Sequence, residues 1–573
     1  MKKILTLLLA AVLVFQISPV ATSANAKPIK VYMEGKQLKP DIAPYISNGR
    51  TLIEARSIFE SMGYTMAYDN KSRIVTGTRE NSVMKLTINS KTATVNGKKV
   101  TLDVAPTIKN GRTVVPVRFV AESAGIDITW DNAKREVRAQ GIQLQPGLEN
   151  WVRRELGIDD TKPILPIDLA VYTALDFYVG YPADAPIALY FENLNDLVHF
   201  PNLKSIDLQG SFTNVRALSK LSKLEHVNLT SYSYLTNLDG LENKPNLKSV
   251  SISTVGSIVS LKPLENATKL QKLVLSEKGK FEKDLLSLAK MKDLQWLSIS
   301  NVADDQVQYL NKLTNLTGLS ITDSPKLTTI ENLDLPNLTS LDIVRSSLNK
   351  ITLKSDLSNL VSLRVPFNQL TELPNAEHMP NLKGLYAPNN QIQSVKSLQQ
   401  FKSITDLTLT NNQIEDLTPL ANLTTLTSIA IGNNKLTSLA PLRNLQSLYL
   451  IDAMHNDITS LEGLENLSNL QYLFVAGNEI QSLVPVASLP RLNKIYAHSN
   501  PIEALPNFVT TFDYEGLRIS ATIDFELLAE YAKTNQIQVI YNDENKAEVE
   551  ALQQRLIDQH IYNLTILHER YAQ

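Results

Sequence analysis

Hydrophobic residues recur along most of the chain at a fixed spacing. From residue 203 the pattern LxxLxL, with apolar residues at its first, fourth and sixth positions, occurs fourteen times, and nine successive spacings are 22 residues. A period in the low twenties predicts a solenoid in which each repeat adds one strand and one short turn or 3₁₀ segment. The first positions are Leu203, Leu224, Leu247, Leu270, Leu294, Leu316, Leu338, Leu360, Leu382, Ile404, Leu426, Leu448, Leu470 and Leu492.

An asparagine stands eight residues after the first apolar position in each of the last seven repeats. At the bend after a strand, backbone N–H and C=O groups turn inward and need partners. A buried Asn amide offers both a donor and an acceptor, so we predict a structural ladder in which each Asn bonds to the neighbouring loop. In the earlier repeats residues such as Tyr232 and Lys278 hold this register, and we expect that half to be less regular and less stable. The ladder residues are Asn368, Asn390, Asn412, Asn434, Asn456, Asn478 and Asn500.

The segment before the repeats contains an internal duplication with an offset of 62 residues. Asn48-Gly49 and Asn110-Gly111 each precede a β-branched run, and each run leads into a segment that ends at Gly63 or Gly125. Asn-Gly predicts a type I′ turn because both residues tolerate positive φ, and the later glycine predicts the end of a short helix. Together with a further hairpin around Asn96-Gly97, this predicts a small β-rich α+β module.

The chain opens with two lysines, an apolar run from Ile4 to Phe15 and an A-x-A sequence at residues 24–26. This order is typical of a secretory signal peptide, and we expect residues 1–26 to be removed. The alternative is a membrane anchor, but the run falls short of the roughly 20 residues that a bilayer requires. Since no later apolar run is long enough either, we expect no membrane span in the mature chain.

The residues before the first repeat predict a linker and a cap. Residues 148–157 have an amphipathic helical pattern that ends at a glycine, and Tyr172, Leu175 and Phe177 indicate a degenerate first strand. A solenoid needs such atypical ends because its terminal repeats would otherwise expose their core. We therefore assign residues 142–202 to the linker and N-terminal cap.

The 22-residue period fails after Asn500. Residues 524–533 and 546–559 have helical patterns, and the β-rich residues 537–541 lie between them. We expect residues 511–573 to form a C-terminal α/β cap, and a separate binding module is the alternative.

The composition removes several classes of chemistry. The chain has no cysteine, which excludes disulfides, thiol nucleophiles and Cys-ligated metals. Its 7 histidines are scattered, and no P-loop, HExxH, GxSxG or EF-hand sequence occurs. We expect a protein that is not an enzyme, with no catalytic residues, no metal and no cofactor.

Charge is divided unevenly along the chain. Residues 27–141 hold 19 Lys and Arg against 11 Asp and Glu, whereas the net charge of the whole chain is −2, so the repeat-bearing part is acidic. An acidic domain disfavours nucleic acid as a partner. The basic module points to an anionic cell-wall polymer, and ordinary solvated surface charge is the alternative.

The second copy of the duplication reads A-P-x-I-x-N-G-R-T-x-V-P-x-R-F-V-A-E-x-x-G and ends in W-D. This pattern resembles the copper amine oxidase N-terminal domain, also called the stalk domain. The likeness covers essentially all of residues 30–141, so we assign residues 27–141 to this domain. The first copy departs from the pattern at Glu54 and Ala55. The oxidase reaction needs copper held by histidines, and this segment has none. The resemblance therefore implies the accessory module without the enzyme.

Segments such as residues 412–423 resemble the repeats of internalin-like leucine-rich repeat proteins, which are secreted bacterial surface proteins. The resemblance implies an α/β leucine-rich repeat solenoid over residues 203–510, with a curved parallel sheet of about 14 repeats of 22 residues. It also implies that residues 148–157 form a helical cap. Since the chain has no LPxTG sorting signal and no cysteine for lipidation, we expect it to be secreted, extracellular or non-covalently associated with the cell wall.

Function is expected on the concave face of the sheet, where the side chains that alternate with the leucines point outward. Small polar residues occupy these positions in the early repeats, and larger residues occupy them in the later ones. Exposed aromatic residues on a rigid surface are enriched at binding hot spots, although scattered ones are ordinary. We expect this face to bind a protein partner, and an envelope carbohydrate-binding or cell-wall scaffolding protein is the alternative. The candidate binding residues are Tyr386, Met454, Tyr472, Phe474, Tyr496 and His498.

Overall fold

The computed structural model describes residues 27–573 except residues 81, 178–189, 257, 277–284, 354, 511, 513–515, 521–522, 543 and 572–573. The expected signal peptide lies outside the described residues. The chain divides into two compact units, with the boundary between Val171 and Tyr172. This boundary falls inside the segment expected to be linker and cap, and each unit is described separately.

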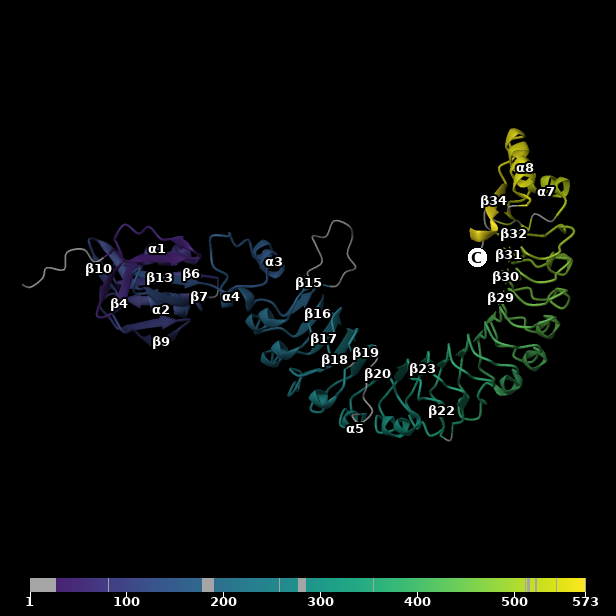
Figure 1. The fold of residues 1–573 in the computed structure, drawn as a ribbon, viewed down its shortest axis with the longest axis horizontal. Coiled ribbons are helices and arrows are strands. Elements are labelled where there is room, and N and C mark those ends of the chain that lie inside the picture. The colour runs from purple at the N-terminus through teal and green to yellow at the C-terminus, as the bar shows by residue number, and fades with distance from the viewer. Residues whose placement is uncertain are drawn as a thin grey trace, which may run out of the picture. The chain divides into compact units, whose positions relative to one another are not determined.

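Three small sheets build the N-terminal unit (Figure 1), and their orders in the described residues are β12-β13-β1-β2, β10-β11-β4-β3 and β5-β6-β7-β8-β9. The two copies of the duplication meet at the antiparallel pair β4–β11, where Val115 lies opposite Ile53. Both residues of each predicted Asn-Gly turn have positive φ, which confirms the type I′ turns. The strands are β1 (Lys30–Met33), β2 (Lys36–Gln37), β3 (Tyr45–Ser47), β4 (Arg50–Glu54), β5 (Thr65–Asp69), β6 (Ile74–Arg79), β7 (Ser82–Thr87), β8 (Thr92–Val95), β9 (Lys98–Thr101), β10 (Thr107–Lys109), β11 (Arg112–Pro116), β12 (Asp127–Asp131) and β13 (Glu136–Gln140).

Each copy also contributes the predicted short helix, followed by Gly63 or Gly125 in the left-handed region with φ of 79° and 78°. The amphipathic segment predicted around residues 148–157 forms a further helix, which Gly157 ends with φ of 61°. The helices of this unit are α1 (Ala55–Ser61), α2 (Val117–Ser123), α3 (Pro146–Leu156) and α4 (Pro166–Leu169).

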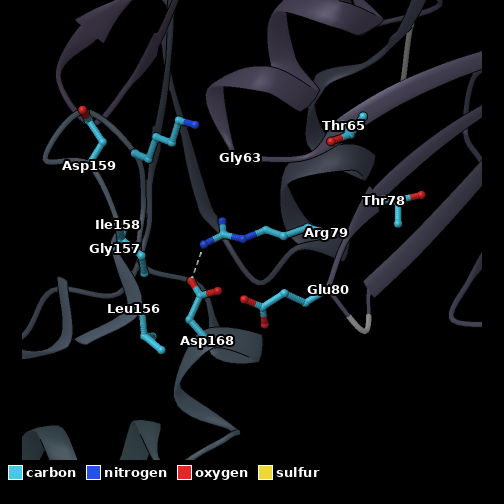
Figure 2. Close-up of a pocket in the computed structure, with 11 residues that line it drawn as sticks. Gly63, Thr65, Thr78, Arg79, Glu80, Leu156, Gly157, Ile158, Asp159 and Asp168 are labelled. Atoms are coloured by element: carbon cyan, nitrogen blue, oxygen red, sulfur yellow. Dashed lines mark hydrogen bonds and ion pairs between the residues drawn. The ribbon is translucent and has the colours of Figure 1, made fainter. Parts of the chain in front are cut away.

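A buried ion pair fastens α4 to the sheets of the same unit (Figure 2). Arg79 at the end of β6 donates from Nη2 to Asp168 Oδ2 at 2.8 Å, and that carboxylate also accepts from the Leu165 backbone N–H at 2.7 Å. The side chains of Arg79 and Asp168 are 11% and 2% exposed. The residues that follow the duplication therefore pack onto this module.

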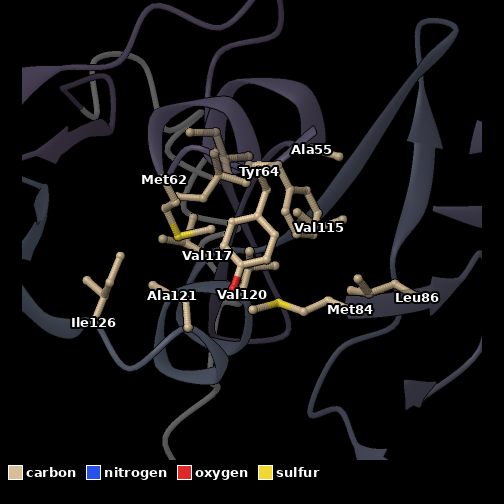
Figure 3. Close-up of a cluster of buried hydrophobic side chains, with 14 of the residues drawn as sticks. Ala55, Met62, Tyr64, Met84, Leu86, Val115, Val117, Val120, Ala121 and Ile126 are labelled. Carbon is tan, nitrogen blue, oxygen red and sulfur yellow. The ribbon is translucent and has the colours of Figure 1, made fainter. Parts of the chain in front are cut away.

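The core of the N-terminal unit lies between the two short helices and the sheets (Figure 3). Met62 and Tyr64 from the first copy meet Val117 and Ala121 from the second, and Met84 joins them from β7. The Tyr64 hydroxyl lies 2.8 Å from Ser82 Oγ, so its buried polar atom has a partner. The two copies thus share one hydrophobic core.

The second unit is built on one sheet, which contains nineteen strands in the described residues, and its neighbouring strands run parallel. Figure 1 shows this unit as an arc with the strands along its inner edge. The predicted curved parallel solenoid is confirmed. The strands are β14 (Ala174–Asp176), β15 (Tyr190–Phe191), β16 (Ser205–Gly210), β17 (His226–Ser231), β18 (Ser249–Thr254), β19 (Lys272–Ser276), β20 (Trp296–Ser300), β21 (Gly318–Thr322), β23 (Ser340–Val344), β25 (Ser362–Arg364), β26 (Gly384–Tyr386), β27 (Asp406–Thr408), β28 (Ser428–Ala430), β29 (Leu450–Asp452), β30 (Tyr472–Phe474), β31 (Lys494–Tyr496), β32 (Leu517–Ser520), β33 (Ile537–Tyr541) and β34 (Leu564–His568).

Short helical turns and one small ladder complete the repeats. The apolar positions of the repeats fill the interior, where Leu382, Leu426 and Leu470 are fully buried. The remaining elements are η1 (Asn195–His199), η2 (Arg216–Lys220), η3 (Lys262–Leu264), η4 (Asp304–Gln306), η5 (Lys396–Gln400), η6 (Thr418–Leu420), η7 (Ala440–Leu442), η8 (Val484–Val486), η9 (Glu569–Tyr571), α5 (Leu285–Leu288), α6 (Val307–Leu310), α7 (Phe525–Ala532), α8 (Lys546–Asp558), β22 (Thr329–Ile330) and β24 (Lys350–Ile351).

The prediction that the period fails after Asn500 is wrong by one strand. β32 pairs in parallel with β31, and Leu517 lies opposite Ile495 at the same 22-residue offset. The ladder asparagine is absent from this turn, which hides the repeat in the sequence. β33 and β34 then extend the sheet, and α7 and α8 lie where helices were predicted.

The ladder asparagines join each loop to the preceding one. In a representative case, Asn412 Nδ2 donates to the backbone oxygens of Ala387, Leu409 and Thr410 at 3.0, 2.9 and 3.3 Å. Its Oδ1 accepts from the Ile392 N–H at 3.0 Å. The other six repeat this set of contacts, so each amide supplies partners that the bend would otherwise lack.

The residue before each ladder asparagine has a left-handed backbone. Asn389, Asn411 and Asn433 have φ of 58°, 57° and 53°, and Phe367 has φ of 55° at the same register. Asn tolerates this conformation far better than an aromatic residue does. The bend after each strand therefore depends on two adjacent positions, one for the conformation and one for the hydrogen bonds.

Hydroxyl groups take over the ladder in the middle repeats. Ser324 Oγ accepts from the Val302 N–H at 3.0 Å, and Ser346 Oγ accepts from the Ser324 N–H at 3.2 Å. A hydroxyl reaches fewer carbonyl groups than an amide does.

The early strands β16, β17 and β18 are six residues long, whereas the strands beside the asparagine ladder are three residues long.

Candidate functional site

The inner face of the sheet presents the side chains that alternate with the buried leucines. On β30 the central residue Leu473 is fully buried, whereas Tyr472 and Phe474 on either side are half-buried. The same pattern holds on β31, where Ile495 is buried and Tyr496 is half-buried. The predicted alternation is therefore present, and it positions aromatic rings on a surface whose backbone the ladder holds.

Four rings form a continuous cluster on this surface. The Phe474 and Tyr496 ring centroids are 4.8 Å apart, and those of Tyr472 and Phe474 are 6.4 Å apart. Tyr449 adds an edge contact, with its centroid 6.4 Å from that of Tyr472. The Arg518 guanidinium lies 4.1 Å from the Tyr496 centroid. We call Tyr449, Tyr472, Phe474, Tyr496 and Arg518 the aromatic cluster.

Two members of the aromatic cluster were not predicted from the sequence. Tyr449 stands at the second position of its repeat, one residue before the first position expected on the concave face. It is 39% exposed. Arg518 lies opposite Tyr496 in the strand register. Its strand, β32, lies beyond the predicted end of the 22-residue period. Its place 22 residues after Tyr496 is the signal that would have identified it.

Asp452 and Met454 flank the aromatic cluster. Asp452 lies opposite Phe474 in the register of β29 and β30, and its Oδ1 accepts from the Met454 N–H at 3.2 Å. Burial raises the pKa of Asp452, although the Met454 N–H and His455 oppose the shift. Met454 is half-buried, so a flexible thioether and a carboxylate border the rings.

His498 is less accessible than the sequence indicated. Burial, followed by the charges of Arg518 and His455, lowers its pKa to about 4. Its Nδ1 is buried and makes no hydrogen bond within the part of the chain that the structure describes. The imidazole is therefore neutral at neutral pH, and the cluster member whose charge acts on it is Arg518.

Tyr386 lies apart from the cluster. Thr408, Ala430 and Asp452 occupy the same column on β27, β28 and β29, between Tyr386 and Phe474. The Arg364 guanidinium lies 5.5 Å from the Tyr386 ring centroid. Tyr386 thus belongs to a separate arginine–tyrosine pair on the same face.

A pocket of about 560 Å³ in the N-terminal unit does not form a reactive site. Arg79, Glu80, Asp159 and Asp168 line it, and the Arg79 guanidinium points at the Asp168 carboxylate (Figure 2). Burial raises the pKa of Asp168, although the Leu165 N–H and Arg79 oppose the shift. The charges of Arg79 and Asp168 pair with each other and hold α4 in place.

Neither a metal-binding group nor a membrane-spanning helix is found among the described residues. Those residues contain no group of three or more His, Asp or Glu side chains placed to hold a metal ion. None of the helices within them is long and apolar enough to cross a membrane.

Two family profiles match segments of the chain, one in each unit. The profile described as the copper amine oxidase N-terminal domain matches residues 32–139, and a profile of two leucine-rich repeats matches residues 380–422. The two resemblances seen in the sequence are thus confirmed. No curated protein matches the chain.

Several solved structures are similar to part of this chain. An internalin from Listeria monocytogenes is 22% identical with a TM-score of 0.41, and the match covers 64% of this chain and 95% of that one. The plant peptide hormone receptor RGFR1, solved in complex with RGF2, is 17% identical with a TM-score of 0.40, covering 64% and 67%. The structure of the Toll–Spatzle complex of Drosophila is 14% identical with a TM-score of 0.40, and the match covers 61% of this chain and 55% of that one.

Proposed function

We propose that this leucine-rich repeat protein, which carries a copper amine oxidase N-terminal domain, is a non-catalytic binding protein whose aromatic cluster contacts a protein partner. The main support is a continuous series of side-chain contacts across four neighbouring repeats. It runs from the ring of Tyr449 through three further rings to the guanidinium of Arg518. Tyrosine, phenylalanine and arginine are enriched in the buried core of protein interfaces. Tyrosine and arginine are also enriched among the few residues that contribute most of the binding energy.

The surface is suited to binding because it needs little ordering. The rings of Tyr472, Phe474 and Tyr496 project from strands whose central residues are buried, and the ladder amides hold the bends that follow. A preformed surface avoids the entropy that a flexible loop loses on binding. The acidic Asp452 and the basic Arg518 at the two sides of the cluster favour a partner with complementary charges.

The proposed place of action is the outside of the cell. The lysines, apolar run and A-x-A sequence at the N-terminus support export, and the absence of cysteine fits a fold that the stacking of repeats stabilises. In this proposal the basic N-terminal module holds the protein on an anionic cell-wall polymer, which leaves the acidic repeat unit for the partner. The excess of lysine and arginine in residues 27–141 supports this second part.

A carbohydrate partner is the second candidate function. Tyrosine and phenylalanine faces also stack on sugar rings, and Phe474 and Tyr496 present two adjacent rings inclined by 40°. The charged residues beside the rings favour a protein, because a neutral glycan offers them no counter-charge.

Capture from separated envelope proteins and envelope polysaccharides tests the proposal. The bait is the chain from residue 27 to residue 573, and it is compared with a variant that carries Ala at positions 472, 474 and 496. A matched control carries Ala at Tyr190, Tyr232 and Tyr234, which are exposed tyrosines in the predicted cap and the early repeats. Capture of one protein that the first variant loses and the control keeps supports the proposal. Capture of polysaccharide with the same pattern favours the second candidate, and equal capture by all three contradicts both.

A further inference from the structure

The N-terminal unit contains a basic pocket that the ion pairs described above do not use. It has a volume of about 320 Å³, and three arginines, Arg50, Arg118 and Arg135, line it together with Trp130 and Ile128. No Asp or Glu is among the described residues that line it. Its size suits one small ligand, since ligand pockets range from about 300 to 1,000 Å³.

The carboxylates that pair with two of these arginines lie on their other side. Arg50 contacts Asp103 at 2.7 Å, and Arg118 contacts Glu122 at 3.7 Å. Asp103 and Glu122 line a neighbouring pocket of about 360 Å³, which shares Arg50 and Arg118 with the basic pocket. Arg50 and Arg118 therefore lie between two pockets, one lined by carboxylates and the other, the basic pocket, lined by none.

Arg135 is the third cation of the pocket. Its backbone is left-handed with φ of 54°, at the turn between β12 and β13. Its Nε is buried and makes no hydrogen bond to any described residue. A buried donor of this kind costs free energy unless a ligand or water accepts from it.

The internal duplication supplies a reference for this pocket. At an offset of 62 residues, Arg56, Tyr68 and Arg73 correspond to Arg118, Trp130 and Arg135. The same offset places Glu54 where the second copy has Pro116, which lines the basic pocket.

Glu54 is buried, and its carboxylate lies 3.9 Å from Arg112 Nε and accepts from the Asp41 N–H at 2.8 Å. Arg112 is the second-copy counterpart of Arg50. The first copy therefore brings a carboxylate to the arginine of the second copy, whereas the second copy has proline at the corresponding place beside Arg50.

Trp130 gives the pocket a second recognition element. It is 37% exposed, so part of the indole faces solvent beside the arginines. A flat aromatic face packs against the C–H groups of a sugar ring, whereas guanidinium groups bind phosphate through paired hydrogen bonds.

We propose that this pocket binds a phosphate-bearing sugar of a cell-wall polymer. Arg118 and Arg135 contact the phosphate, and Trp130 packs on the sugar ring. The inference deepens the wall-binding part of the proposed function and rests on it for the source of the sugar phosphate.

Tryptophan fluorescence of the chain from residue 27 to residue 573 tests the pocket. The probes are N-acetylglucosamine 1-phosphate, neutral N-acetylglucosamine and inorganic phosphate. We expect the sugar phosphate to quench the emission and to bind at least about tenfold more tightly than either other probe, since it alone engages both elements. Trp130→Phe should abolish the quenching, because Trp151 and Trp296 lie outside the pocket.

The two copies supply the variants. Arg135→Ala and Arg118→Ala should each weaken binding of the sugar phosphate about tenfold, whereas their counterparts Arg73→Ala and Arg56→Ala should change it less than about twofold. Pro116→Glu restores the residue that the first copy carries at this place and should weaken binding as much as Arg135→Ala. Equal losses in both copies, or equal affinity for inorganic phosphate, would overturn the proposal.

Co-sedimentation with purified cell walls at low salt separates this proposal from the one it rests on. If the unaltered chain sediments and the double variant Arg118→Ala, Arg135→Ala stays in solution, both are supported. Equal sedimentation of the two would overturn the pocket and leave the wall-binding part standing. If the unaltered chain binds the sugar phosphate but does not sediment, the wall-binding part fails and the pocket stands.

Discussion

The rings of Phe474 and Tyr496 lie on adjacent strands with their centroids 4.8 Å apart and their planes inclined by 40°. This contact is the tightest ring pair of the aromatic cluster, and it links Tyr472 on one side to Arg518 on the other. The two rings thus support each other before any partner arrives.

A double-mutant cycle in denaturant-induced unfolding measures this support. Phe474→Ala and Tyr496→Ala should couple by about 0.5–1.5 kcal/mol, the range found for aromatic pairs in contact. The reference cycle pairs Phe474→Ala with Tyr234→Ala, which lies in a distant repeat and should show additive effects. Additivity within about 0.3 kcal/mol for the first pair would mean that the rings do not hold one another.

The asparagine ladder should carry a large share of the stability of the later repeats. Asn412→Ala removes one acceptor and the donors to three backbone carbonyls at a nearly buried position, so we expect a loss of about 2–4 kcal/mol. Asn444→Ala changes an exposed asparagine and should stay within about 0.5 kcal/mol of the parent. Unfolding monitored by circular dichroism gives both values, and similar losses would contradict the ladder.

The left-handed column predicts a stabilising substitution. Phe367 has φ of 55° and is 54% exposed, so its ring gains little from burial while its backbone is strained. Phe367→Asn should stabilise the repeat unit by about 0.5–1 kcal/mol, because asparagine tolerates this conformation. Val361→Asn, at a similarly exposed apolar residue that has no positive φ, should give no such gain. A lower unfolding midpoint for Phe367→Asn would show that its ring makes a needed contact.

The buried imidazole predicts a pH dependence. The pKa of His498 falls from 6.5 to about 4 on folding, so between these values the unfolded chain binds a proton that the folded chain does not. The stability therefore falls as the pH drops from about 6.5 towards about 4, and this contribution is constant above that window. After allowance for the partial exposure of the ring, we expect His498 to account for about 1–2 kcal/mol of that loss.

Urea unfolding at pH 7 and pH 4.5 checks this assignment. His498→Gln has no ionisable group, so the difference in unfolding free energy between the two pH values should be smaller than in the parent. Asn444→Ala, which replaces an exposed residue that has no ionisable group, is the control and should keep the parent's difference between the two pH values. An unchanged pH difference in His498→Gln would refute the assignment.

The leucine register predicted the sheet closely because a repeat that stacks on its neighbours must bury the same positions each time. Leu473 and Ile495 are buried where the pattern placed them. Tyr472, Phe474 and Tyr496 lie together on the concave face of the sheet. Arg518 was missed because its turn has no ladder asparagine.

The basic pocket could not be predicted from either copy of the duplication alone. Arg50 belongs to the first copy and Arg118 to the second, and they meet only because β4 pairs with β11. That pairing follows from the shared core, which the local patterns around Asn48 and Asn110 do not describe. The difference between Glu54 and Pro116 was visible in the sequence, and its consequence required the structure.

Site-specific photo-crosslinking tests the central claim most directly. A photoreactive phenylalanine analogue replaces Phe474 in one chain and Tyr234, which is 74% exposed, in another, and each chain is irradiated with separated envelope proteins. If the aromatic cluster is the partner-binding face, position 474 yields one dominant protein adduct that unlabelled parent chain competes away, and position 234 does not yield it. A protein adduct from position 234 alone, or none from position 474 while the parent chain still captures the partner, would contradict the claim.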